Sequence, residues 1–235
     1  MSDDAPTIEI AESALADLPL FPLPETVLLP HTLVSLHIFE PRYRKMIAHC
    51  LDTHRVLAIA TLDEHGHPDA HGRPPILKTA GLGYIRRSAR LPDGRYNLVV
   101  EGVGRITIEE ELEPETPFRR GRTHLLEDEL PEDPKELSMA RLAVSSLATR
   151  VLAGSEHAEL IENLPSLPPG ELADTVAAAV LEEARDRQGI LEEAQLARRL
   201  DQLSGALGAA LLERTPDESD DEPGVLGWGV IPGKA

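Results

Sequence analysis

A proline-rich apolar stretch at residues 18–46 opens the hydrophobic pattern of the chain. We expect extended backbone at residues 26–29 and 33–38, because the stretch contains prolines that lack the backbone donor a helix needs. These prolines are Pro22, Pro24 and Pro30. Pro41 then has the fixed φ of a first helical residue, so a helix should follow at residues 41–51.

Short apolar or alternating segments after this helix predict a series of strands. They lie at residues 55–61, 78–87, 96–101, 105–109 and 118–126. Asp93 and Gly94 indicate a hairpin, and we expect both to take the positive φ of a type I′ turn. Gly102 and Gly104 indicate a bend or bulge. Short strands joined by tight turns, with one helix inserted early, predict a small twisted barrel or sandwich.

From residue 133 onwards, apolar residues recur at helical spacing. Asp133 and Pro134 are typical of the first residues of a helix, and this helix should reach residue 152. Three further helices are expected at residues 157–163, 170–188 and 191–213. Gly189 should interrupt the pattern between the last two. The last helix carries a leucine stripe typical of a bundle core. Its members are Leu196, Leu200, Leu203, Leu207 and Leu211.

These patterns divide the chain into four segments. We expect a flexible acidic leader at residues 1–16, a strand-rich subdomain at 17–128, a helical-bundle subdomain at 129–214 and a disordered acidic, Gly-rich tail at 215–235. A chain of 235 residues with 41% hydrophobic residues can bury a sizeable core. Since aromatic residues make up only 3%, that core should consist of Leu, Val, Ile and Ala.

The charge is strongly negative and unevenly distributed. The net charge is −18, and residues 126–235 hold 9 Lys and Arg against 23 Asp and Glu. An acidic chain repels phosphate backbones and anionic lipids, which argues against nucleic-acid and membrane partners. One cysteine, the lack of a basic, apolar signal sequence and short apolar runs predict a cytoplasmic protein without a membrane span.

Five arginines near the expected hairpin are the best candidates for contact with an acidic partner. They are Arg86, Arg87, Arg90, Arg95 and Arg105. We favour solvated strand faces as their explanation and keep a docking patch as the alternative. Glu40 and Arg42 form either a buried ion pair at the corner between strand and helix, which we favour, or a partner-contact pair.

Two further groups have the residue types of reactive sites. The histidines of a polar loop could be mistaken for a metal site, but real sites draw ligands from rigid elements, so we interpret the segment as a flexible loop. These histidines are His65, His67 and His71. Cys50 lies on the expected apolar face of its helix, and we interpret it as a buried structural thiol. We therefore predict no metal, no cofactor and no catalytic residue.

Four segments together resemble the Lon substrate-binding domain, the N-terminal domain of Lon proteases, which also occurs as a stand-alone protein. They are LFPL at residues 20–23, HIFEPRY at 37–43, LPDG at 91–94 and VEGVGR at 100–105. The signature residues are Phe21, Pro22, Pro30, Phe39, Glu40, Pro41, Arg42, Tyr43, Asp93, Gly94, Glu101 and Gly102. The resemblance covers residues 17–213. It implies an α+β fold, a PUA-like twisted β-barrel with one inserted helix followed by a C-terminal helical bundle, and a role in binding proteins or peptides.

Parts that a complete Lon protease needs are missing from the sequence. A Walker A loop has the pattern GxxxxGK[ST], and the nearest segment, residues 229–235, has the wrong glycine spacing and no Ser or Thr. No motif supports a Ser-Lys dyad. Because these elements are missing, we expect a protein that is not an enzyme. The IFEPRY form is similar to stand-alone members of the family.

The leading hypothesis is therefore a module that binds proteins or unfolded polypeptide segments, as an adaptor or competitor for a Lon-type protease. The alternative is RNA binding by the hairpin arginines, because PUA-like barrels elsewhere bind RNA, although the net charge argues against it. The third hypothesis is a hydrolase or metal enzyme whose active site is the histidine loop. We assign a structural role to the corner at Glu40 and Pro41, and expect binding near the hairpin or between barrel and bundle.

Overall fold

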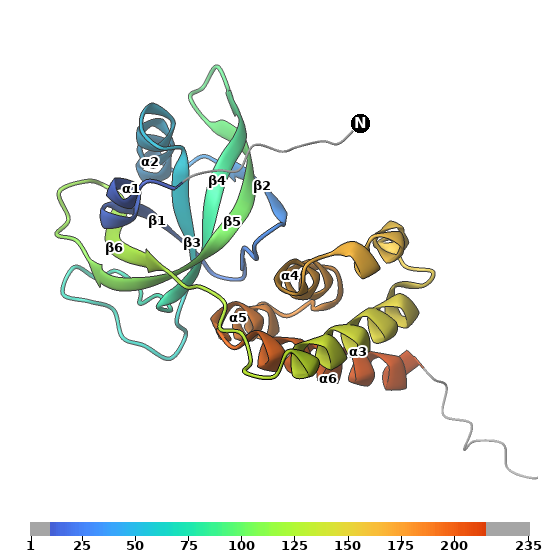
Figure 1. Ribbon diagram of the computed structural model, residues 1–235. Helices are drawn as coiled ribbons and strands as arrows, with labels where there is room; N and C mark the ends of the chain where they lie inside the picture. Colours follow the sequence, from blue (N-terminus) through green and yellow to red (C-terminus); the bar gives the residue numbers. More distant parts are fainter. Residues whose placement is uncertain (1–9, 215–235) are drawn as a thin grey trace, which may run out of the picture.

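The computed structural model describes residues 10–214 and contains a strand-rich part followed by a helical part (Figure 1). The strands are β1 (Leu18–Leu23), β2 (Leu33–Ile38), β3 (Val56–Thr61), β4 (Thr79–Arg90), β5 (Tyr96–Glu111) and β6 (Arg119–Leu125). The first helices are α1 (Glu12–Ala16) and α2 (Pro41–Asp52). The helical part holds α3 (Pro134–Leu152), α4 (Pro169–Val180), α5 (Ala184–Glu192), α6 (Leu196–Arg214) and two short 3-10 helices, Ala158–Glu162 and Leu164–Ser166. The described residues thus form a mixed α/β protein.

The strands form one sheet in the order β2-β5-β4-β3-β1-β6, and β6 pairs with β5 as well. β1 runs parallel to β3, and the other pairs are antiparallel. β5 is 16 residues long, so its first half pairs with β2 and its second half with β6. The pairings therefore run in a circle through β5, β4, β3, β1 and β6, which requires the sheet to curve. The PUA-like barrel stays a prediction.

The hairpin between β4 and β5 differs from the predicted type I′ turn. Gly94 has a φ of 82°, whereas the φ of Asp93 is not positive. The backbone N–H of Leu91 donates to the carbonyl of Arg95 at 2.8 Å, which encloses a three-residue loop. The ring of Pro92 fixes its φ at about −65°, which fits a type I turn followed by a glycine bulge.

Part of the expected flexible leader is folded. Residues 12–16 form α1, where Ala14 is buried. The hydroxyl of Thr123 in β6 donates to the carbonyl of Leu15 at 2.9 Å and so ties this helix to the sheet. The flexible-leader prediction therefore fails for these residues. The rest of that leader, residues 1–9, and the expected tail, residues 215–235, lie outside the described residues.

The helical part differs from the prediction in where its helices end. α4 stops at Val180, where Leu181 leaves the helical conformation and is buried, and the Arg187 side chain donates to the Leu181 carbonyl at 2.7 Å. That contact satisfies a carbonyl at the end of the helix. Residues 181–183 separate α4 from α5, so the expected single helix at residues 170–188 was wrong. Gly189, the expected interruption, lies inside α5.

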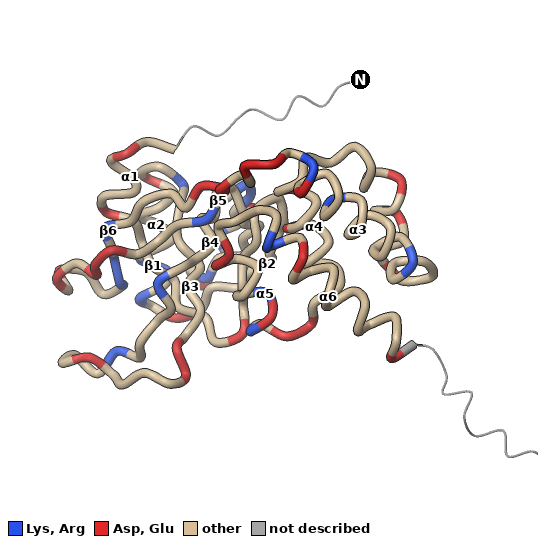
Figure 2. The backbone as a smooth tube through the Cα atoms, turned by 60° about the horizontal axis from the view of Figure 1, so that its bottom comes forward, with Lys and Arg blue, Asp and Glu red and all other residues tan. Residues whose placement is uncertain are grey.

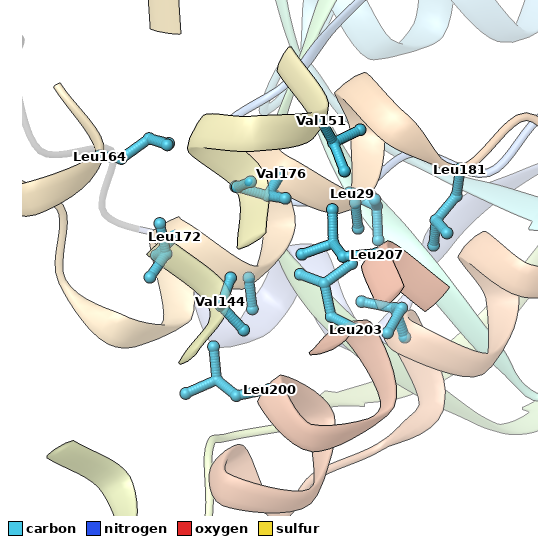
Figure 3. Close-up of a cluster of buried hydrophobic side chains, with 14 of the residues drawn as sticks. Leu29, Val144, Val151, Leu164, Leu172, Val176, Leu181, Leu200, Leu203 and Leu207 are labelled. Atoms are coloured by element: carbon cyan, nitrogen blue, oxygen red, sulfur yellow. The ribbon is translucent and has the colours of Figure 1, made fainter. Parts of the chain in front are cut away.

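The leucine stripe of α6 forms the bundle core, as predicted. Leu200, Leu203 and Leu207 are fully buried. Figure 3 shows that Leu29, from the loop between β1 and β2, lies among the side chains of the same cluster. The opening stretch therefore packs onto the helical part as well as the sheet.

Two glycines let the loop between β1 and β2 pack closely against the sheet. A Cβ on Gly81 would lie 2.0 Å from the carbonyl oxygen of Leu28, and one on Gly102 would lie 2.0 Å from that of Leu29. Only glycine allows such an approach of two backbones. Residues 26–29, where we expected extended backbone, belong to no strand, and residues 27–30 are buried.

Within the described residues, every helix is too short or too polar to cross a membrane.

Candidate functional site

An apolar cleft is formed by β1, the end of β2, the start of α2 and two loops, at residues 62–74 and 114–118. Its volume is about 670 Å³. Its aromatic lining comprises Phe21, Phe39, Tyr43 and Phe118, and its prolines are Pro22, Pro24, Pro74, Pro114 and Pro117. We call this site the apolar cleft.

The cleft collects aromatic rings in a chain that has few of them. The chain contains three phenylalanines, and all three line the cleft. The rings of Phe21 and Tyr43 pack with centroids 4.5 Å apart and are buried. Phe39 differs, because 62% of it is exposed and its ring stacks on His37 at 6.3 Å. An exposed ring at the edge of an apolar recess can bury its surface against a ligand.

The local sequence explains why Phe39 is exposed. β2 ends at Ile38 and α2 begins at Pro41, so Phe39 lies in the corner between them. Glu40 takes the N-cap position, but its carboxylate makes no cap hydrogen bond and pairs with Arg42 at 2.9 Å. Both side chains of this pair are about half exposed. The expected buried ion pair was therefore wrong, and such an exposed pair contributes about 1 kcal/mol at most.

Arg42 also covers the ring of Tyr43, with its guanidinium carbon 4.5 Å from the ring centroid. Burial raises the pKa of Tyr43, and the neighbouring Arg42 opposes that change. The phenol is therefore neutral at physiological pH. The Tyr43 ring therefore adds no charge of its own to the cleft, while the Arg42 guanidinium above it is charged.

Ion pairs fix the loop that supplies Pro74. The Arg119 side chain donates to the Pro74 carbonyl at 2.7 Å and to Glu111 at 2.8 Å. Asp69 accepts backbone hydrogen bonds, and its pKa is lowered to about 2, chiefly by the bond from the Arg73 N–H. The loop that we interpreted as flexible is thus anchored at both of these points.

The histidine loop and the cysteine fall in different surroundings. His71 lines the apolar cleft, and residues 10–214 contain no group of three His, Cys, Asp or Glu that could hold a metal ion. Cys50 is fully buried, and burial raises the pKa of its thiol to about 12. Its placement agrees with the predicted structural thiol.

Four of the five candidate arginines lie on or beside the β4–β5 hairpin. Arg86 pairs with Glu101, and Arg95 pairs with Asp93 at 2.6 Å. Arg87 is exposed, and the guanidinium of Arg90 lies 6.0 Å from the Tyr96 ring. Figure 2 shows Lys and Arg segments interspersed with Asp and Glu segments over the backbone. Two of the four hairpin arginines are thus paired with carboxylates.

Arg105 lies elsewhere and is only 4% exposed. Its guanidinium donates to the carbonyls of Leu191 and Glu193, at 3.0 and 2.7 Å, and to the carboxylate of Asp128 at 2.5 Å. It joins the sheet to the helical part, so its inclusion among partner-contact residues was wrong. The same contacts fill part of the junction where we had considered a binding surface.

Comparison with known proteins decides the family. The family model of the ATP-dependent protease La (LON) substrate-binding domain matches residues 17–207. The chain belongs to this family. The Lon protease of Geobacter metallireducens is 26% identical to this Lon substrate-binding domain protein over 211 residues, which are 87% of this chain and 25% of that protein. The Lon protease of Xanthomonas oryzae pv. oryzae is 24% identical over 199 residues, which are 83% of this chain and 23% of that protein. The chain thus spans about a quarter of the length of these curated relatives.

Two solved structures share the fold of this Lon substrate-binding domain. The N-terminal domain of Mycobacterium avium complex Lon protease gives a TM-score of 0.64 at 22% identity, covering 82% of this chain and 98% of that one. The Lon N-terminal domain protein from Xanthomonas campestris gives a TM-score of 0.59 at 23% identity, and the match covers 80% of this chain and 97% of that one. The resemblance seen in the sequence is confirmed.

The sequence reasoning missed the apolar cleft, although it had singled out the residues that form it. Phe21 and Phe39 were interpreted as signature residues of the fold, and the binding surface was expected elsewhere. The available signal was the placement of all three phenylalanines in proline-rich segments of a chain poor in aromatics. Only the tertiary structure shows that Phe118 lies with the other two.

Proposed function

We propose that this Lon substrate-binding domain protein captures exposed apolar segments of polypeptides in the apolar cleft and catalyses no reaction on them. The exposed ring of Phe39 beside the other two phenylalanines carries the proposal. Burying one such ring on binding contributes about 1.5–3 kcal/mol. A site with one exposed aromatic anchor thus suits reversible capture.

The lining of the apolar cleft also suits ligands of varied sequence. Its five prolines present apolar rings and no backbone N–H. Rings of this kind gain affinity from contact area and impose few directional hydrogen bonds. A segment of unfolded polypeptide would therefore be recognised by its apolar side chains rather than by one sequence.

The test compares two exposed apolar residues with the same substitution. Phe39→Ser should weaken binding of a reduced, permanently unfolded protein about tenfold, measured by fluorescence anisotropy. Leu142→Ser is the matched control, because Leu142 is 71% exposed on α3, away from the cleft lining. Equal binding by wild type and Phe39→Ser, or equal losses in both variants, would contradict the proposal.

We propose further that the protein works beside a Lon-type protease, as an adaptor or a competitor. The support is the family and the match to about a quarter of the Lon protease relatives. Adding the protein to a purified Lon protease that degrades an unfolded substrate should change the degradation rate, upwards for an adaptor and downwards for a competitor. Phe39→Ser should reduce either change. An unchanged rate with wild-type protein would reject this role.

A further inference from the structure

A second recess adjoins the apolar cleft across β2. It has a volume of about 830 Å³ and is formed by β2, β4, β5 and the residue before β3. Leu36 and His37 line both recesses. The second recess is lined by Arg55, Arg86 and Arg87 and by no Asp or Glu, in a chain with a net charge of −18. We call it the arginine groove.

A β-bulge concentrates the cations in this groove. The register of β4 against β5 shifts between Ile85 and Arg87, so Arg86 and Arg87 together oppose Val99. An extra residue of this kind re-aims side chains, and neither arginine is buried. Two consecutive guanidinium groups therefore lie outside the core, where strict alternation would have buried one.

Arg55 reaches the same place from another element. It has a φ of 60°, and its Nη2 donates to the carbonyl of Ile85, beside the bulge, at 2.8 Å. Its guanidinium carbon lies 5.9 Å from the centroid of the Tyr84 ring, and that of Arg86 lies 5.5 Å from it. The backbone contact holds Arg55 in place, yet it neutralises no charge.

The charges in the groove are only partly compensated. Glu101 pairs with Arg86. Among the described residues, Arg55 and Arg87 have no carboxylate within ion-pair distance. The groove therefore presents two uncompensated cations next to the apolar side chains of Leu36 and Val99.

We propose that the arginine groove binds an acidic stretch of the same polypeptide whose apolar segment occupies the apolar cleft. This inference rests on the proposed function of the cleft, because the two recesses meet at Leu36 and His37. Aspartate and glutamate side chains complement uncompensated guanidinium groups and accept their hydrogen bonds in pairs. An RNA strand fits less well, because the lining of the groove contains no Phe, Tyr or Trp ring on which a base could stack.

Fluorescein-labelled peptides test this assignment with the full chain at physiological salt. The first joins an apolar aromatic segment to a run of glutamates, and the second replaces the glutamates by glutamines. Arg87→Glu should weaken binding of the first at least about fivefold and leave the second unchanged. The control is Arg122→Glu on β6, where the native arginine is 55% exposed and pairs with Glu110; it should change neither affinity.

The same titrations separate failure of the groove from failure of the cleft. Phe39→Ser should weaken both peptides; if it weakens neither, the proposed function of the cleft fails. If Phe39→Ser weakens both but Arg87→Glu affects both peptides alike or not at all, the groove assignment alone is overturned. Tighter binding of labelled oligouridine than of the glutamate peptide, lost in Arg87→Glu, would assign the groove to nucleic acid and overturn it too.

The chain's own acidic run, Asp217–Glu222, is a competing occupant. Replacing its carboxylates by amides should leave the affinity for the glutamate peptide unchanged if the occupant comes from a partner. A higher affinity of this variant for the glutamate peptide would show that the chain fills its own groove. That result would overturn the assignment to a partner.

Discussion

The guanidinium of Arg199 lies 4.0 Å from the carboxylate of Asp174, and both side chains are buried in the helical part of the protein. Arg199 also pairs with Asp128 at 2.8 Å, which in turn pairs with Arg105 from the sheet. Two arginines and two aspartates from different parts of the chain thus meet at this junction, where the Asp128 side chain is 32% exposed and the other three are buried. This cluster, together with Gln188, joins the sheet to the helices.

Asp174 makes stability depend on pH. Burial raises its pKa from 3.8 to about 7, against the opposing effect of Arg199 and then Arg105, while Asp128 and Glu171 add to the increase. Between these two pKa values the folded chain holds a proton that the unfolded chain has lost, so stability falls as pH rises from about 4 to 7. The loss is roughly 4 kcal/mol at most.

We expect Asp174→Asn to flatten this dependence, because its amide does not titrate. Urea unfolding at pH 5 and pH 8 measures the effect, and wild type should lose more stability than the variant between these values. If wild type and variant lost the same amount, the Asp174 carboxyl would not titrate in this window.

Arg105→Met should destabilise the fold by about 3–5 kcal/mol. The substitution leaves Asp128 without one of its two arginines and removes the donors to the carbonyls of Leu191 and Glu193. Chemical denaturation measures the change. Arg122→Met is the matched control, since this arginine is exposed on β6, and it should cost less than about 1 kcal/mol. Similar costs for both variants would remove Arg105 from its role at the junction.

Gly81→Ala should destabilise the fold by about 1–3 kcal/mol, because the new methyl group would push against the Leu28 carbonyl. Gly205→Ala provides the opposite control. Nothing lies within 4 Å of a Cβ at Gly205 in α6, so alanine should stabilise the helix there by up to about 1 kcal/mol. Thermal unfolding of the two variants should give shifts of opposite sign. A neutral Gly81→Ala would mean that the loop can move away without cost.

Cys50 should react with a thiol reagent only when the protein opens. The thiol is fully buried and its raised pKa of about 12 leaves almost no thiolate at neutral pH. With dithionitrobenzoate, native protein should react far more slowly than protein in denaturing urea. Since the chain has one cysteine, the native rate reports opening of the core around α2. Rapid labelling of native protein would contradict the burial of this side chain.

The sequence alone predicted those features that depend on residues close together in the chain. The prolines fixed the start of α2, Asp133 caps α3 through the Lys135 N–H at 2.9 Å, and the leucine spacing gave the core face of α6. The family also followed from short motifs. Each of these features depends on backbone preferences or on one periodic face, and a sequence displays both directly.

Features that depend on contacts between distant residues could not be predicted. The sequence does not show that Arg105 is buried against the Leu191 and Glu193 carbonyls, while Arg87, also in a strand, is exposed. It does not show either that a bulge places Arg86 beside Arg87 or that Phe118 joins Phe39 in one cleft. Residue types determined the family and elements such as the starts of α2 and α3 and the core face of α6. Sheet register and the packing of loops on the sheet decided which side chains meet, because these contacts join residues far apart in the chain.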